Sequence, residues 1–155
     1  MARIAIQNAL FMGRAKASAL TISWCTYTDP EIAHVGMYER DAQQKGIQAD
    51  TFIRHFKDVD RAVLDGEQEG FVKINVNKGT DRIIGATIVA KHAGEMISEI
   101  SVAMAGNIGL KTISRVIHPY PTQAEAIKQI GDMYNRSRLT PFFEKAFSWW
   151  FRWNR

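Results

Sequence analysis

The sequence predicts an α+β fold: an antiparallel sheet of about five strands with helices packed on one side. Its length and composition fit one globular domain, since the chain has 155 residues, of which 46% are apolar and 23% are charged. Segments with strand patterns follow one another through short turns, and most helical patterns come after residue 93. This separation of strands and helices along the chain is typical of the α+β class.

The first elements are predicted near the N-terminus. Residues 2–11 carry apolar side chains without a clean period, and we expect the last piece of a helix there. Residues 19–27 are rich in β-branched and aromatic residues and end at a Thr-Asp-Pro turn signal, so they predict the first strand. Residues 32–36 predict a short second strand, and the polar segment 38–45 predicts a helix that Gly46 ends in the usual C′ position.

Three more strands are predicted, over residues 49–57, 70–77 and 82–91. The middle one alternates most clearly, with an apolar residue at every second position from Val72 to Asn77. The Lys-Gly-Thr-Asp sequence that follows predicts a hairpin connection to the next strand. Helices are then predicted over 94–107, 122–134 and 141–153.

Several kinds of functional site are excluded by the residue pattern. Cys25 is the only cysteine, which excludes an internal disulfide, a zinc site of several thiolates and a CxxC dithiol. We expect Cys25, next to Trp24 in a strand segment, to be a buried core residue. The glycines form no GxGxxG or P-loop pattern, and the histidines share no short metal-ligand spacing. We therefore expect no metal site, no bound cofactor and no complete active site in this chain alone.

Hydropathy and charge bear on location and partners. No apolar run approaches the roughly 20 residues of a spanning helix, and residues 1–11 make a poor secretory signal because polar residues interrupt them. We therefore expect a cytoplasmic protein. The net charge is +3 over residues 1–16 and +4 over residues 136–155, which leaves −3 for residues 17–135. A mildly acidic body with basic ends does not fit nucleic-acid binding.

The most distinctive segment runs from His118 to Glu125 with the sequence HPYPTQAE. Each of its two prolines biases the preceding residue away from helix, so we expect a stiff, extended loop. Thr122 and Glu125 have the spacing of a capping box, in which both side chains satisfy the first amides of a helix. That interpretation leaves open why a stiff loop would display His118 and Tyr120 before a helix start, where an anionic ligand or an electron-rich ring is favoured.

This segment resembles the His-Pro-Thr-x-x-Glu signature of the dimerisation domain of flavin-dependent pyridine nucleotide–disulfide oxidoreductases. That family includes dihydrolipoamide dehydrogenase, glutathione reductase and mercuric reductase. Three other stretches resemble it in the same order: YTDPEIAHVG at 27–36, GFVKI at 70–74 and IGATIVAKHAGEMI at 84–97. The resemblance covers residues 18–135, and residues 2–11 look like the last helix of the flavin domain that precedes this domain in the family.

The resemblance implies residues 1–16 as the end of the flavin domain and its linker and residues 17–135 as the dimerisation domain. The residue pattern adds residues 136–155 as a basic and aromatic amphipathic C-terminal helix. The resemblance also implies a homodimer. The FAD domain, the NAD(P) domain and the redox cysteine pair of the parent protein would lie upstream of this chain. FAD and NAD(P)H would be cofactors of that parent, and this chain alone would be inactive.

In the thiol-handling members of the family, the signature loop reaches the partner's active site, where its histidine acts as acid and base and its glutamate orients that histidine. Aligning Pro121, Thr122 and Glu125 with the signature puts Tyr120 at the histidine position and His118 two residues earlier. The resemblance thus implies Tyr120 and Glu125 as catalytic residues, with His118 as a secondary candidate. The loop that faces the partner's flavin would comprise Pro119, Tyr120, Pro121 and Thr122.

The substitution of tyrosine for histidine changes the expected chemistry. With an ordinary pKa of about 10, a tyrosine is a poor base near neutral pH but can donate a hydrogen bond. Mercuric reductases resemble this chain in carrying tyrosine here, but they also end in a cysteine pair that delivers mercury. Residues 136–155 contain no cysteine, so the resemblance does not extend to mercury as a substrate.

The C-terminal segment 139–155 supports two interpretations that stay open. Thr140 and Pro141 form a good helix opening, and the aromatic residues after them fill an arc of roughly 200° with basic residues opposite. Such a helix fits an in-plane position on a membrane surface, which would place the protein at the periphery of the inner membrane. It equally fits a helix packed across the dimer or against the upstream domains.

Two functions follow from the sequence. The favoured one is the C-terminal dimerisation domain of a FAD-dependent, NAD(P)H-linked disulfide or metal-ion oxidoreductase, in which the loop around Tyr120 completes the partner subunit's active site. The alternative is a stand-alone dimerisation or interaction module without redox activity, held at a membrane surface by residues 139–155.

Overall fold

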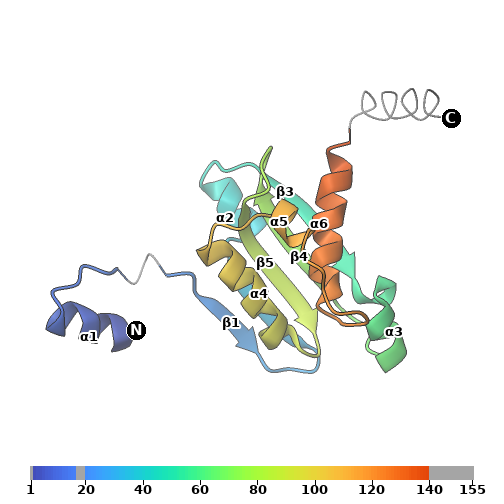
Figure 1. Cartoon of the computed structure of the whole chain (residues 1–155), viewed down its shortest axis with the longest axis horizontal. Coiled ribbons are helices and arrows are strands. Elements are labelled where there is room, and N and C mark those ends of the chain that lie inside the picture. The colour runs from blue at the N-terminus through green and yellow to red at the C-terminus, as the bar shows by residue number, and fades with distance from the viewer. Residues whose placement is uncertain (1, 17–19, 140–155) are drawn as a thin grey trace.

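The computed structural model describes residues 2–16 and 20–139, and its fold is the α+β fold that the sequence predicts (Figure 1). Five strands form one antiparallel sheet in the order β1-β2-β5-β4-β3. The strands are β1 (Ser23–Thr26), β2 (Glu31–Gly36), β3 (Ala49–His55), β4 (Phe71–Asn77) and β5 (Ile83–Ala90). The α-helices are α1 (Ala2–Leu10), α2 (Glu39–Gln44), α3 (Asp60–Asp65), α4 (Ala93–Ala105), α5 (Leu110–Ile113) and α6 (Glu125–Ser137).

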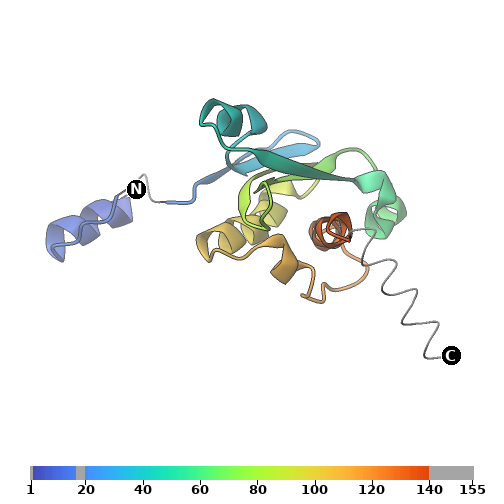
Figure 2. The same ribbon diagram turned by 90° about the horizontal axis from the view of Figure 1, so that it is seen from above.

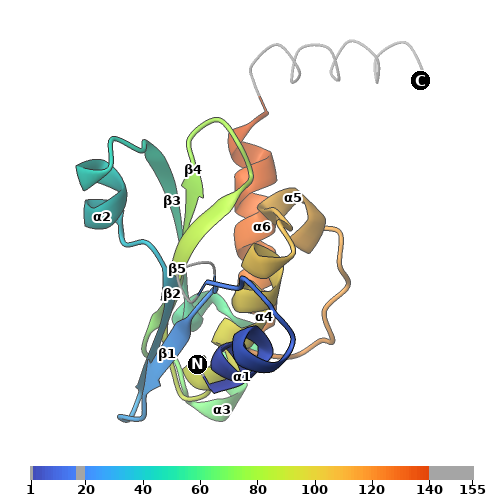
Figure 3. The same ribbon diagram turned by 90° about the vertical axis from the view of Figure 1, so that its left-hand side faces the viewer.

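The longer helices cover one face of the sheet, as expected (Figure 2). Helix α4 packs across β1, β2 and β5, whereas α6 packs across β3 and β4 and also contacts α5. Figure 3 shows the short helix α2 on the opposite side of the sheet, next to β3. There Glu39 of α2 accepts a hydrogen bond from Thr51 of β3 and pairs with Lys73 of β4, so polar contacts hold α2 in place.

The core lies between the sheet and the two longer helices. Val72, Ile74 and Val76 of β4 have no exposed surface, which matches the alternation in the sequence. The helices contribute Ile97 and Ile100 from α4, and residues of α6, to the same cluster. Because α6 is buried along this face, the segment just before it is held against the rest of the domain. None of the helices in the described ranges is long and apolar enough to cross a membrane.

Several element boundaries differ from the sequence prediction. The strand predicted over 49–57 ends at His55, and a short 3₁₀ helix (η2, Phe56–Asp58) and α3 follow it. The sequence analysis missed α3 and α5 because helices of six and four residues are too short to show a helical period. Helix α6 begins at Glu125, three positions after the predicted start at residue 122. The helix predicted over 141–153 lies outside the described residues.

Candidate functional site

The segment between α5 and α6 forms an exposed loop that is fixed at one point to α4. The His118 side chain is 7% exposed, and its Nε2 lies 2.9 Å from Oε1 of Glu99 on α4. Its other ring nitrogen, Nδ1, lies 3.3 Å from the carbonyl oxygen of Val116. The neighbouring Ile117 is 91% exposed, whereas His118 turns inward. Both ring nitrogens of His118 therefore have protein partners.

Tyr120 lies on the exposed side of the same loop. It is joined to Pro121 by a cis peptide bond, and 68% of Tyr120 is exposed. Its hydroxyl donates a hydrogen bond to Oδ2 of Asp60, the first residue of α3, at 2.8 Å. This bond and the charge of Asp60 raise the pKa of Tyr120 above the ordinary value of 10.0, and Glu125 adds a smaller effect in the same direction. The phenol is thus held neutral as a hydrogen-bond donor.

The capping box predicted for Thr122 and Glu125 does not form. The Thr122 hydroxyl donates to the carbonyl oxygen of Pro119 at 2.8 Å, and Ala124, not Thr122, is the residue that precedes α6. A short polar side chain can bond a nearby carbonyl as well as a helix amide, and the proline-rich turn places such a carbonyl within reach. Glu125 instead turns inward, and its Oε2 is buried without a hydrogen-bond partner in residues 2–16 and 20–139, as is Oε1 of Gln123.

The structure therefore brings Tyr120 together with Asp60, which the sequence analysis did not identify. Asp60 and Tyr120 are 60 residues apart in the chain, and no local motif relates them. Within the described ranges, no group of three or more His, Cys, Asp or Glu side chains could hold a metal ion. The chemistry that this arrangement offers is hydrogen-bond donation from an exposed, oriented phenol.

The family can now be assigned. The sequence profile of the pyridine nucleotide-disulphide oxidoreductase dimerisation domain matches residues 22–130, which is more than half of the chain. The chain belongs to this family.

Relatives of known sequence and structure agree with the assignment. The chain is 40% identical to the mitochondrial dihydrolipoyl dehydrogenase of Caenorhabditis elegans over 103 residues, 66% of this chain and 21% of that protein. It is 32% identical to the mercuric reductase of Shewanella putrefaciens over 124 residues, 80% of this chain and 22% of that protein. Among solved structures it is similar to LpdA of Mycobacterium tuberculosis, with a TM-score of 0.78 and 29% identity over 85% of this chain and 29% of the other. The chain thus spans about a fifth of the length of these curated relatives.

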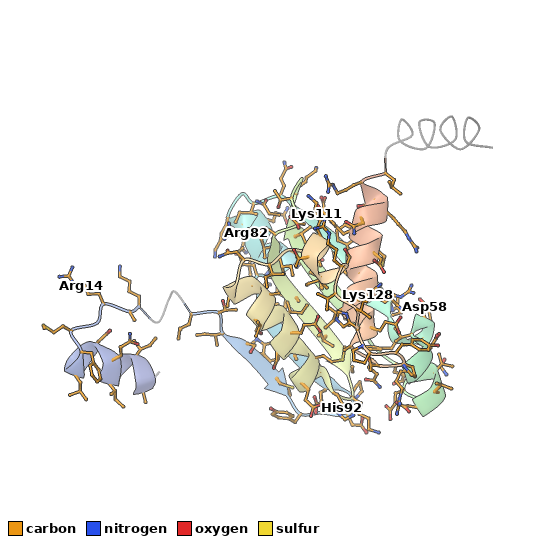
Figure 4. All side chains as sticks on the ribbon, viewed as in Figure 1. Arg14, Asp58, Arg82, His92, Lys111 and Lys128 are labelled. Atoms are coloured by element: carbon orange, nitrogen blue, oxygen red, sulfur yellow. The ribbon has the colours of Figure 1, made fainter. Side chains whose placement is uncertain are left out.

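His92 and Cys25 are two further residues of this dimerisation domain with titratable side chains, and each makes few specific contacts. His92, at the start of α4, lies 3.7 Å from Glu95, and both side chains are more than half exposed. Figure 4 labels His92, before α4, and Asp58, the last residue of η2, at different places in the domain. Cys25 is partly buried against the core, as expected for a packing residue. Neither His92 nor Cys25 therefore offers a set of contacts as specific as that of the proline-rich loop.

Proposed function

We propose that this chain is the C-terminal dimerisation domain of a FAD-dependent, NAD(P)H-linked oxidoreductase and that two copies form its homodimer interface. The observation that carries the proposal is the match of the dimerisation-domain profile over residues 22–130. The relatives are several times longer than this chain, so in the proposed parent protein the nucleotide-binding domains lie outside it. They include enzymes named for dihydrolipoyl and mercuric substrates, and the substrate of the parent protein is a disulfide or a metal ion in this proposal.

The proposed interface comprises the outer side of α4 and the adjoining loop. Val102 is 68% exposed on α4, one helical turn after Glu99, and therefore lies on the same side of the helix. Because Glu99 contacts His118, the exposed Val116 and Ile117 lie close to this side of α4. Exposed apolar side chains gathered on one helix and one loop favour contact with another protein surface. In a two-fold symmetric dimer the same patch would meet its own copy.

The loop would then reach the partner subunit from the edge of this interface. Tyr120 is an exposed aromatic residue of this loop, and the Asp60 contact holds it in a fixed direction. An exposed aromatic ring on a stiff loop fits a position against a bound flavin, and Pro119, Pro121 and Thr122 would form the rest of that surface. FAD, when bound by the parent protein, supplies the electron transfer. Tyr120 would donate its hydroxyl hydrogen bond near the reacting group. Glu125, at the start of the next helix, would be the second catalytic residue.

The interface is tested by changing the oligomeric state. We expect the chain to form a dimer of twice its 17.5 kDa mass, measured by size-exclusion chromatography with light scattering. The double variant Val102→Glu, Ile117→Glu should run as a monomer, because two exposed apolar side chains of the patch become charged. Ile53→Glu is the matched control, since Ile53 is also exposed but lies on the opposite face of the sheet. An unmodified 155-residue chain that is monomeric, or a double variant that stays dimeric, would refute the proposed interface.

The parent activity is tested on the native protein captured from its source through this domain. A chain several times longer than 155 residues with a visible flavin absorption band supports the oxidoreductase. A colourless chain of 155 residues supports the alternative, a stand-alone dimerisation module without redox activity.

The aromatic and basic sequence of residues 139–155 is what favours membrane-surface attachment in that alternative. Its test is co-sedimentation with anionic liposomes, compared between the full chain and a chain that lacks residues 139–155. Equal sedimentation of the two chains would exclude the attachment.

A further inference from the structure

Two carboxylates lie near the Tyr120 hydroxyl, and only one of them bonds it. Oδ2 of Asp60 accepts the hydroxyl hydrogen bond at 2.8 Å. The charge of Glu125 raises the pKa of Tyr120 by a smaller amount, and its buried Oε2 has no hydrogen-bond partner among the described residues. The residue that the family resemblance assigns to orientation is therefore not the residue that orients Tyr120 in this structure.

We propose that Asp60 is the positioning residue of Tyr120 and takes the orienting role that the signature loop would otherwise give to Glu125. The inference rests on the proposed function of Tyr120 at the partner's active site. It assigns a role to α3, an element whose sequence carries no functional motif.

The surroundings of Asp60 suit it to this role. Helix α3 is fixed by the buried side chains of Val59 and Ala62, so the backbone at Asp60 is held by residues on both sides. The next residue, Arg61, pairs with Asp65 at 2.7 Å. In the described part of the chain Asp60 forms no ion pair, so no neighbouring cation competes with the Tyr120 hydroxyl for its carboxylate.

The contact has two consequences that can be separated. The first is geometric, because an accepted hydrogen bond fixes where the phenol points. The second is electrostatic, because ionising the phenol would place two negative charges within hydrogen-bond distance of each other. Tyr120 thus acts as an oriented donor and does not act as a base at neutral pH. Replacing Asp60 with Asn keeps an acceptor oxygen and removes the charge, whereas replacing it with Ala removes both.

The test is an ultraviolet titration of tyrosinate in the 155-residue chain, with the signal of Tyr120 isolated by subtracting the curve of Tyr120→Phe. We expect Asp60→Asn to move the Tyr120 midpoint down toward the ordinary tyrosine value. Asp65→Asn is the matched control on the same helix and should leave the midpoint unchanged, because Asp65 bonds Arg61. Glu125→Gln should lower the midpoint less than Asp60→Asn does. Circular dichroism and urea midpoints establish that each variant is folded.

A second measurement reads the position of the ring. In crystal structures of the variants we expect Tyr120 to stay in place in Asp60→Asn and to leave α3 in Asp60→Ala. The proposal is overturned if the Tyr120 midpoint of a folded Asp60→Asn variant equals that of the unmodified chain. It is also overturned if Glu125→Gln lowers this midpoint more than Asp60→Asn does. Neither measurement needs a flavin or a dimer. Repeating the titration in the monomeric Val102→Glu, Ile117→Glu variant separates a failure of this inference from a failure of the proposed interface.

Discussion

Nε2 of His118 lies 2.9 Å from Oε1 of Glu99, and this contact ties the proline-rich loop to α4. The His118 side chain is 7% exposed, whereas Tyr120 two residues later is 68% exposed. The two candidates that the sequence offered for one role therefore occupy different environments. His118 anchors the loop to α4, and Tyr120 is left exposed on the same loop.

The anchoring role of His118 predicts a loss of stability when it is removed. We expect His118→Ala to lower the free energy of unfolding by about 1–3 kcal/mol, because Glu99 loses its partner and a buried side chain is deleted. A double-mutant cycle with Glu99→Ala, measured by urea unfolding, should give a coupling of at least about 0.5 kcal/mol. Glu95→Ala is the control on the same helix, because Glu95 is 84% exposed. Additive effects of the two changes would contradict a direct contact.

Gly85 of β5 and Gly46 after α2 differ in their surroundings, and this difference predicts different costs for their substitution by alanine. A Cβ on Gly85 would lie 2.6 Å from the backbone nitrogen of Met37, and backbone atoms cannot move aside cheaply. We expect Gly85→Ala to cost about 3 kcal/mol of unfolding free energy. At Gly46 a Cβ would meet nothing within 4 Å, but its φ of +69° disfavours other residues, so Gly46→Ala should cost roughly 1 kcal/mol. Urea unfolding of both variants checks this order, and equal costs would contradict it.

The buried His34 predicts that stability falls in mild acid. His34 is 3% exposed and lies on the sheet face opposite to α4; its Nδ1 is 2.9 Å from the Thr87 hydroxyl and its Nε2 is 3.1 Å from the Gly36 carbonyl oxygen. Because a carbonyl oxygen only accepts, Nε2 carries the proton and the Thr87 hydroxyl donates to Nδ1. Burial lowers the pKa of His34 below 6.5. Below pH 6.5 the unfolded chain binds a proton at this residue before the folded chain does, so folding stability is lost as the pH falls.

The variant His34→Gln should remove this part of the pH dependence, which is at most about 1.4 kcal/mol per pH unit for one group. The measurement is the free energy of urea unfolding at pH values above and below 6.5, compared with the parent chain. His55→Gln serves as the control because His55 is exposed at the end of β3. If the unmodified chain and His34→Gln lose the same free energy of unfolding on acidification, His34 is not the source of this pH dependence.

The sheet could be predicted from sequence because its signals are local. Val72, Ile74 and Val76 alternate with polar residues, and in the structure all three are fully buried under the helices. Helix α3 could not be predicted in this way, since its six residues Asp60–Asp65 give less than two helical turns of pattern. Its position is set by the packing of Val59 and Ala62 against residues far away in the chain.

The candidate site was predictable only in part, for a related reason. Two prolines next to Tyr120 indicate a stiff exposed loop, and that information is local. The bond from Tyr120 to Asp60 joins residues that tertiary packing alone brings together, and the family resemblance directed attention to Glu125. Thr122 shows the opposite failure. Its local spacing to Glu125 suggested a helix cap, but in the folded loop the Thr122 hydroxyl donates to the Pro119 carbonyl oxygen and does not accept from a helix amide.

Cys25, the only cysteine of the chain, should be a poor nucleophile. Burial raises the pKa of its thiol, and the carboxylate of Glu31, whose Oε2 lies 3.9 Å from Sγ, raises it further. A higher thiol pKa leaves less thiolate at neutral pH, and the thiolate is the reactive form. We therefore expect Cys25 to react with a disulfide reagent at least about tenfold more slowly than glutathione does.

The control for this prediction is the same chain unfolded in urea, where the reaction rate should rise to that of an ordinary thiol. In the folded chain, Glu31→Gln should increase the reaction rate of Cys25, because it removes the negative charge near the thiol. The glutamine keeps an oxygen that can accept the hydrogen bond from the Gly94 amide, which is 2.9 Å long in the unmodified chain. If Cys25 of the folded, unmodified chain reacts as fast as glutathione, it is an accessible thiol and this prediction is wrong.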